Sequence, residues 1–218
     1  MEIVGQSVRI ISNCNKEEAY KLIETAGRTC HRSVNKENDE AVTEKFIQNL
    51  IKSGHTSVLE HYSITFNAVT SRATANELVR HRIASYSQES TRYCNYCNKR
   101  FKDGIRFILP SLICVAGAEA EGKFINKLSE IEAMYMELLN KYKQTPDIAR
   151  SILPLCTATE ITFTFNIRSL RNFLQLRLSK SAHCEIRELA TLMLAELNSI
   201  IPVFFEDITE KYINAQNK

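Results

Sequence analysis

The chain has no tryptophan and only 6 Gly and 4 Pro among its 218 residues. So few turn-forming residues exclude a collagen-like or low-complexity chain. No apolar run approaches the ~20 residues that span a bilayer, and the N-terminal Met-Glu-Ile-Val-Gly-Gln-Ser lacks the basic and apolar regions of a signal peptide. The seven cysteines are odd in number and scattered, which argues against the disulfide framework of a secreted domain. We therefore expect a reduced protein of the cytoplasm.

A large excess of charge of one sign is also missing. The chain has 28 Lys and Arg against 25 Asp and Glu, which gives a formal net charge of +3. This charge is too small to indicate a protein that coats nucleic acid or a membrane surface. With 44% hydrophobic residues, a chain of this length can bury a substantial core, and we expect residues 1–218 to form a single domain.

Two common nucleotide-binding and hydrolase motifs are absent. There is no glycine-rich phosphate loop and no Gly-x-Ser-x-Gly nucleophile motif. Any bound phosphate must therefore be held by side chains, chiefly by arginine and hydroxyl groups. The basic residues are sorted accordingly, because two windows without lysine, 53–98 and 144–179, contain Arg72, Arg80, Arg82, Arg92, Arg150, Arg168, Arg171 and Arg177.

Hydrophobic periodicity predicts a few strands among many helices. Alternation predicts strands over 62–70 and 157–166, with shorter ones at 8–12 and 106–109. Helical spacing and capping signals predict helices over 16–25, 42–51, 73–82, 124–142, 169–178 and 185–201, and short ones that begin at Pro146 and Pro202. The polar stretch 84–96 is predicted to be a loop. This order indicates an α+β fold, with a central and mostly antiparallel sheet and several packed helices.

Two polar segments are candidates for ligand binding. In the first, Arg80-His81-Arg82 precedes a stretch rich in hydroxyl groups that ends at Arg92, and its groups could contact a phosphate or a base. The alternative is a charged helix end followed by a solvated loop. The second segment runs from Asn166 to Arg177, where arginines and asparagines enter a predicted helix and could form a polar wall. For Arg171 alone we favour a position on the solvated side of a surface helix.

Metal binding is not expected at either of the other two clusters. His55, Glu60 and His61 do not have the His-Glu-x-x-His spacing, and a helical turn capped by Thr56 or Ser57 explains them better. The pair Cys94 and Cys97 lacks the second pair that a zinc site needs, so local packing is the favoured interpretation.

Five blocks, taken together, resemble the flavin-dependent thymidylate synthases, the thymidylate synthase complementing protein family. Arg80-His81-Arg82, followed by seven residues and Ser90, matches the family's Arg-His-Arg-x7-Ser signature. The other four blocks lie in the family's order within about residues 54–187, one before this signature and three after it. The block before it is Gly54-His55-x-Ser57-x-x-Glu60-His61. The three after it are Ala149-Arg150-x-x-Leu153-Pro154, Asn166-x-Arg168-Ser169-Leu170-x-Asn172-Phe173-x-x-Leu176-Arg177 and Ala182-x-x-Glu185-Ile186-Arg187.

The resemblance implies reductive methylation of dUMP to dTMP by a homotetramer whose active sites lie between subunits. It implies 5,10-methylenetetrahydrofolate as carbon donor, NADPH as reductant and bound FAD, with no metal, nucleic acid or membrane partner. The residues matched to FAD are His55, Ser57, Arg80, His81, Arg82, Gln88, Asn166, Arg168 and Asn172. Those matched to dUMP are Glu77, Arg80, Gln88, Glu89, Ser90, Thr91, Arg92, Arg150 and Arg177.

The matched role of Arg177 is catalytic, because a cation beside the uracil stabilises the negative charge that makes C5 nucleophilic. No cysteine is then expected to be essential. The chain departs from the family pattern at Glu77, at Gln88 and in Ser181-Ala182-His183, where the family often has His-Ala-Gln. Two other functions compete with this one: an RNA-binding module that uses Arg and Tyr, and a metal-dependent nucleotide hydrolase that uses His55, His61 and His81.

Overall fold

The computed structural model describes residues 1–30, 32–33, 39–98, 104–110 and 115–212. The chain folds into two compact units, each assembled from three stretches. Unit 1 contains Met1–Ser7, Ala68–Arg80 and Ser87–Ile161, and unit 2 contains Val8–Asn67, His81–Tyr86 and Thr162–Lys218. The organisation of the chain as a single domain stays a prediction.

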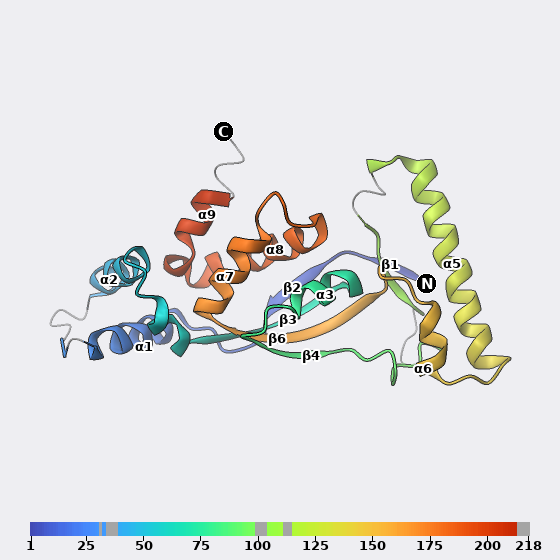
Figure 1. Cartoon of the computed structure of the whole chain (residues 1–218), viewed down its shortest axis with the longest axis horizontal. Helices are drawn as coiled ribbons and strands as arrows, with labels where there is room; N and C mark the ends of the chain where they lie inside the picture. Colours follow the sequence, from blue (N-terminus) through green and yellow to red (C-terminus); the bar gives the residue numbers. More distant parts are fainter. Residues whose placement is uncertain (31, 34–38, 99–103, 111–114, 213–218) are drawn as a thin grey trace. The chain divides into compact units, whose positions relative to one another are not determined.

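The strands form a four-stranded antiparallel sheet and a separate parallel pair (Figure 1). The order in the larger sheet is β2-β3-β6-β4, and the pair joins β1 to β5 with Ile3 opposite Phe107. The predicted α+β fold with a mostly antiparallel sheet is confirmed. The strands are β1 (Glu2–Val4), β2 (Ser7–Ile10), β3 (Ser63–Ser71), β4 (Ser85–Gln88), β5 (Arg106–Ile108) and β6 (Ala158–Asn166).

Helices make up most of the remaining regular structure. The α-helices are α1 (Lys16–Thr29), α2 (Glu40–Lys52), α3 (Arg72–Leu78), α5 (Ala118–Asn140), α6 (Pro146–Ala149), α7 (Ile167–Arg177), α8 (Cys184–Ile200) and α9 (Glu206–Tyr212). Short 3-10 helices are η1 (Thr56–His61), η2 (Arg150–Ile152) and η3 (Pro202–Phe204). The predicted cap Asn15 is confirmed, since its side chain accepts a hydrogen bond from the Glu18 N–H at 3.1 Å. No helix in the described ranges is both long and apolar enough to cross a membrane.

The core of unit 2 is built on the alternation predicted for β3 and β6. Phe66 and Phe163 are buried and stack with ring centroids 5.4 Å apart. The opposite faces carry Thr65 and Thr164, whose hydroxyl groups lie 2.9 Å apart. Helix α7 follows β6 directly and buries Phe173, so the strand positions the first turn of the helix.

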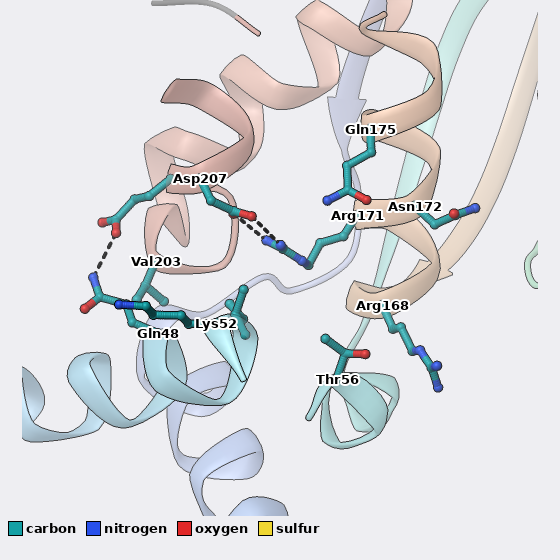
Figure 2. Close-up of a pocket in the computed structure, with 11 residues that line it drawn as sticks. Gln48, Lys52, Thr56, Arg168, Arg171, Asn172, Gln175, Val203 and Asp207 are labelled. Carbon is teal, nitrogen blue, oxygen red and sulfur yellow. Dashed lines mark hydrogen bonds and ion pairs between the residues drawn. The ribbon is translucent and has the colours of Figure 1, made fainter. Parts of the chain in front are cut away.

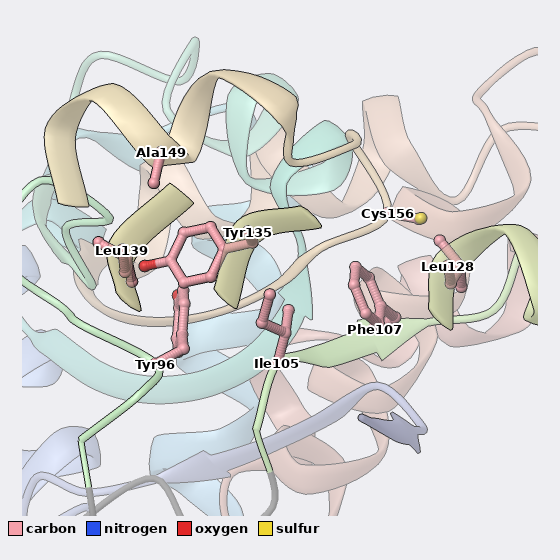
Figure 3. Packing of buried hydrophobic residues seen from close by; sticks show 8 residues of the cluster. All are labelled: Tyr96, Ile105, Phe107, Leu128, Tyr135, Leu139, Ala149 and Cys156. Atoms are coloured by element: carbon pink, nitrogen blue, oxygen red, sulfur yellow. The ribbon is translucent and has the colours of Figure 1, made fainter. Parts of the chain in front are cut away.

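Unit 1 has its own hydrophobic cluster, in which one side of α5 meets the loops around β5 (Figure 3). Tyr96 and Tyr135 are buried there with ring centroids 5.8 Å apart. Cys94 and Cys97 are partly buried against this cluster, which confirms packing as the favoured interpretation of the Cys-x-x-Cys pair. The cluster consists of Tyr96, Ile105, Phe107, Leu128, Tyr135, Leu139, Ala149 and Cys156.

Two sequence predictions around the Arg-His-Arg segment are wrong. The helix predicted over 73–82 ends at Leu78, so Arg80 lies in a turn and His81 follows it outside the helix. Within the predicted loop 84–96, Ser85–Gln88 forms β4. As an edge strand, β4 can expose its polar side chains while its backbone pairs with β6, so it lacks the apolar run that reveals a central strand.

Candidate active site

Helix α7 presents two predicted flavin ligands on one face. Its N-cap is Asn166, whose side chain accepts a hydrogen bond from the Ser169 N–H at 2.8 Å. Arg168 and Asn172, four residues apart, are exposed on the same side of the helix (Figure 2). Arg168 forms an ion pair with Glu60 at 2.5 Å, and both side chains are about half exposed. Because an exposed ion pair is weak, an incoming phosphate can compete for this guanidinium.

The residues of the Gly-His block precede and form η1, which packs against α7. His55 occupies the N-cap position, and the predicted capping hydrogen bond from Thr56 or Ser57 is absent from this described helix, so that prediction is wrong. The turn before η1 instead closes the C-terminal end of α2: His55 N–H donates to the Leu50 carbonyl at 2.9 Å, after Gly54 with its φ of 75°. The His55 and Ser57 side chains are exposed.

The structure brings His81 and Arg177 together across 96 residues of sequence. Arg177 Nε donates a hydrogen bond to His81 Nε2 at 3.0 Å. The imidazole also meets the Phe173 ring edge-on at 4.9 Å, and the Tyr86 hydroxyl donates to the His81 carbonyl at 2.7 Å. Burial, and then the positive charge of Arg177, lowers the pKa of His81 to about 4. The ring is therefore a neutral acceptor at physiological pH.

A turn that begins after Glu89 holds three residues matched to dUMP. Tyr93 N–H and Cys94 N–H both donate to the Ser90 carbonyl, at 3.1 and 2.9 Å. Thr91 is buried in the turn, with 7% of its surface exposed, whereas Arg92 is exposed. Preceding the turn, Gln88 Nε2 donates to the Thr159 hydroxyl at 3.2 Å.

Arg150 lies in the same neighbourhood as Arg92 in unit 1. The pKa of Asp147 is lowered first by a hydrogen bond from Thr145 and then, among smaller effects, by the positive charges of both arginines. Arg150 is exposed at the start of η2. Two exposed guanidinium groups acting on one location can bind a dianionic phosphate.

The remaining predicted ligands are Glu77, which is half-buried in the last turn of α3, and Arg80 and Arg82, which are exposed on either side of His81. Most residues matched to FAD belong to unit 2, and most residues matched to dUMP belong to unit 1. Of the residues matched to FAD, seven lie in unit 2: His55, Ser57, His81, Arg82, Asn166, Arg168 and Asn172. Of those matched to dUMP, all except Arg177 lie in unit 1.

The donor set of unit 2 suits a flavin dinucleotide. Arg82 and Arg168 are exposed guanidinium groups, each able to bind a phosphate, and exposed imidazole, hydroxyl and amide groups can hydrogen-bond to sugar and base atoms. Within the described ranges, no group of three or more His, Cys, Asp or Glu side chains is arranged to hold a metal ion.

Arg171 is buried, so its predicted solvated position is wrong. Only 6% of its surface is exposed, and its guanidinium donates to both carboxylate oxygens of Asp207, at 2.8 and 2.7 Å, and to the Phe204 carbonyl. The partners lie more than 30 residues away in sequence, so the helix pattern alone gave no sign of them. Arg171 thus ties α7 to η3 and α9 and has a structural role.

Sequence reasoning also missed a polar pocket of about 620 Å³ in unit 2 (Figure 2). Gln48 and Lys52 of α2 and Gln175 of α7 line it, and the spacing of Gln175 from Asn172 is the one signal that could have found it. The pocket shares two predicted flavin ligands with the outer face of α7. Its lining consists of Gln48, Ile51, Lys52, Thr56, Arg168, Arg171, Asn172, Gln175, Val203, Glu206 and Asp207.

The chain is similar to known proteins over most of its length. Residues 9–203 match a family model described as thymidylate synthase complementing protein. A relative from Mycobacterium sp. (strain JLS), named flavin-dependent thymidylate synthase, is 37% identical over 211 residues, which cover 88% of this chain and 80% of the relative. Relatives of the same name are similar: that from Mycobacteroides abscessus is 35% identical over 201 residues, and that from Mycobacterium tuberculosis (strain H37Ra) is 36% identical over 197, each alignment covering 85% of this chain and 78% of the relative.

Proposed function

The chain belongs to the thymidylate synthase complementing protein family, and from this premise we propose that it converts dUMP to dTMP with 5,10-methylenetetrahydrofolate, NADPH and bound FAD. It is a flavin-dependent thymidylate synthase and therefore a methyltransferase. The observation that carries the proposal is the hydrogen bond between His81 and Arg177, because it joins two family-matched blocks that lie 96 residues apart.

The flavin is proposed to be held by side chains, since the chain has no glycine-rich phosphate loop. Arg82 and Arg168 would bind the diphosphate, and His55, Ser57 and Asn172 would hydrogen-bond to the rest of the dinucleotide. Bound FAD supplies the hydride chemistry, with NADPH as the proposed reductant. Asn166 is proposed to act indirectly. Its side chain caps α7 and so fixes the first turn of the helix, which carries Arg168.

The nucleotide phosphate is proposed to bind at the turn after Glu89. Arg92 and Arg150 supply positive charge, and the Ser90 hydroxyl can supply a further hydrogen bond. This arrangement agrees with the electrostatic effect of both arginines on Asp147. No lysine lies in the window that contains Ser90 and Arg92, so the phosphate would meet forked donors.

Arg177 is proposed to act on the uracil ring. Negative charge must develop on the N3 and O4 side before C5 can attack the one-carbon unit, and a guanidinium placed there stabilises it without a covalent step. His81 accepts the Nε–H, and because the guanidinium is planar this bond fixes its plane. The neutral imidazole orients the cation without cancelling its charge.

The wider setting is proposed from family membership alone. We place the enzyme in the cytoplasm as a homotetramer with active sites between subunits, and we expect no nucleic-acid or membrane partner. The matched residues divide between unit 1 and unit 2, which is compatible with sites assembled from more than one stretch of chain.

The test measures flavin content and dTMP formation on the same preparation. The purified protein should absorb as a flavoprotein and form dTMP only when dUMP, methylenetetrahydrofolate and NADPH are all present. Arg177→Ala should lose at least about 100-fold in kcat, because the guanidinium is proposed to act on charge that develops in the transition state. Arg9→Ala, at an exposed arginine of β2, is the control and should retain turnover. FAD-loaded wild-type protein that forms no dTMP would contradict the proposal.

A further inference from the structure

Glu89 is held at each of its polar atoms by other parts of unit 1. Its backbone N–H donates to the Glu160 carbonyl at 2.8 Å, and its own carbonyl accepts from Arg72 Nη2 at 3.0 Å. In the side chain, Oε1 accepts from the Tyr96 hydroxyl at 2.7 Å and Oε2 from the Glu160 N–H at 3.3 Å. Arg106 lies 3.9 Å from Oε2. This set of bonds fixes the position of both the backbone and the carboxylate of Glu89.

The bond to Tyr96 lies in a largely dry environment. Only 14% of the Glu89 side chain is exposed, and Tyr96 is 6% exposed within the hydrophobic cluster of Figure 3. Burial raises the pKa of Tyr96, and the charge of Glu89 raises it further, so the phenol stays a donor. A buried carboxylate that lost this partner would keep its desolvation cost, which makes the pair sensitive to removal of the hydroxyl group.

The pair encloses the predicted phosphate-binding turn. Glu89 comes directly before Ser90, and Tyr96 lies seven residues beyond Glu89. Between them, the Ser90 carbonyl accepts from two backbone N–H groups. The bond between Glu89 and Tyr96 therefore closes a short loop that carries Ser90 and Arg92.

We propose that Glu89 is a positioning residue for the dUMP phosphate site and does not itself contact the substrate. With Tyr96 and Arg72 it fixes the loop from which Ser90 and Arg92 reach the phosphate. A carboxylate pointing at the phosphate would repel it. The Glu89 carboxylate instead accepts hydrogen bonds from the Tyr96 hydroxyl and the Glu160 N–H. This inference rests on the proposed function and changes the direct contact with dUMP that the family match implied for Glu89.

The test is Tyr96→Phe, which removes one hydroxyl group and keeps the ring in the hydrophobic cluster. We expect the KM and the dissociation constant for dUMP to rise about 5- to 30-fold, because a hydrogen bond to a buried charge orients the loop. The value of kcat at saturating dUMP, the KM for NADPH and the FAD content should stay within about twofold. The Tyr96 hydroxyl group is proposed to fix only the loop that binds the phosphate, and not the groups that act on the uracil or the flavin.

The matched control is Tyr20→Phe in unit 2. The Tyr20 hydroxyl donates to Glu44 Oε1 at 3.1 Å, and Tyr20 is buried with 3% of its surface exposed. This variant loses the same kind of bond and should lower Tm, but it should leave dUMP binding unchanged. A purely structural role of Tyr96 would give the same result as Tyr20→Phe and would overturn the proposal.

Glu89→Gln provides the second test and serves if Tyr96→Phe does not fold. The amide oxygen can still accept from Tyr96, and only the longer 3.3 Å bond from the Glu160 N–H is lost, so its effect on dUMP binding should be less than about fivefold. A loss of dUMP affinity of more than about fivefold would indicate direct contact and contradict positioning. A calorimetric titration with dUMP, together with the turnover assay, separates failure of the proposed function from failure of the positioning role. If wild-type protein neither binds dUMP nor forms dTMP, the proposed function fails; if it does both and the variants bind dUMP normally, only the positioning role fails.

Discussion

His81 should stay uncharged down to about pH 5, well below the range in which free imidazole titrates. Its pKa is lowered from 6.5 to about 4 by burial and, secondarily, by Arg177. At pH 6, an imidazole with the ordinary pKa is about 75% protonated, and one with a pKa of about 4 is about 1% protonated. Only the neutral ring can accept the Arg177 Nε–H, because both ring nitrogens of the imidazolium are donors.

The sign of the stability effect follows from the lowered pKa. Between pH 6.5 and about 4 the unfolded chain binds a proton at this position and the folded chain does not, so the free energy of unfolding falls as the pH falls through this window. A pKa difference of this size corresponds to about 3 kcal/mol if it is fully expressed. Because the ring is only half-buried, solvent screening reduces the expected loss to about 1–2 kcal/mol.

The assay is an NMR titration of the ring, with the His81 resonance assigned from the variant His81→Gln. In Arg177→Gln the pKa should rise by less than half of the difference from 6.5, because burial is the larger of the two causes. Urea unfolding at pH 7 and pH 5 measures the loss of stability. A wild-type ring that titrates near 6.5 would refute the reasoning, and complete recovery of 6.5 in Arg177→Gln would show that charge rather than burial dominates.

Two further predictions concern the structural arginine and the thiols. Arg171→Met should lower the free energy of unfolding by about 1–3 kcal/mol in urea titrations, because Asp207 loses both hydrogen bonds of an ion pair whose guanidinium is buried and whose carboxylate is half exposed. Burial alone would raise the pKa of Asp207, but hydrogen bonds and charge from Arg171 lower it, so the contribution of the pair is present above about pH 4 and is lost as the pH falls through the folded pKa. Replacing any one cysteine by alanine should leave kcat within about threefold in folded protein, and a single replacement that abolished turnover would contradict the proposed non-covalent activation of the uracil.

Local sequence signals predicted those parts of the fold that neighbouring residues determine. The alternation in β3 and β6 was sufficient because one face of each strand is buried against aromatic partners such as Phe66 and Phe163. The cap at Asn15 was predictable because its acceptor and donor lie three residues apart. The strand β4 was not predictable, since its partner β6 lies about 70 residues away and its own side chains are polar.

The candidate site was predicted by family resemblance rather than by local pattern, and its internal contacts were not predicted at all. The match placed both His81 and Arg177 among ligand-binding residues without indicating that they bind each other. The match likewise assigned Glu89 to the substrate without indicating that its carboxylate accepts a hydrogen bond from Tyr96. Such contacts depend on packing between distant segments, which a spacing of residues along one chain does not encode.

All six cysteines that the structure describes are free thiols, and Cys114 lies outside the described residues.

The three arginines of α7 show why the partner of a guanidinium, more than its spacing, decides its role. Arg171 is buried and bound bidentately by the Asp207 carboxylate, so its charge is used within the fold. Arg168 meets a carboxylate of η1 in solvent, where an exposed ion pair is weak enough to yield to a phosphate. Arg177 donates to the neutral His81, an acceptor that orients a cation but does not neutralise it. One helix can therefore carry a structural cation, one proposed to bind phosphate and one proposed to be catalytic, and the distinction lies in the chemistry of residues brought from elsewhere in the chain.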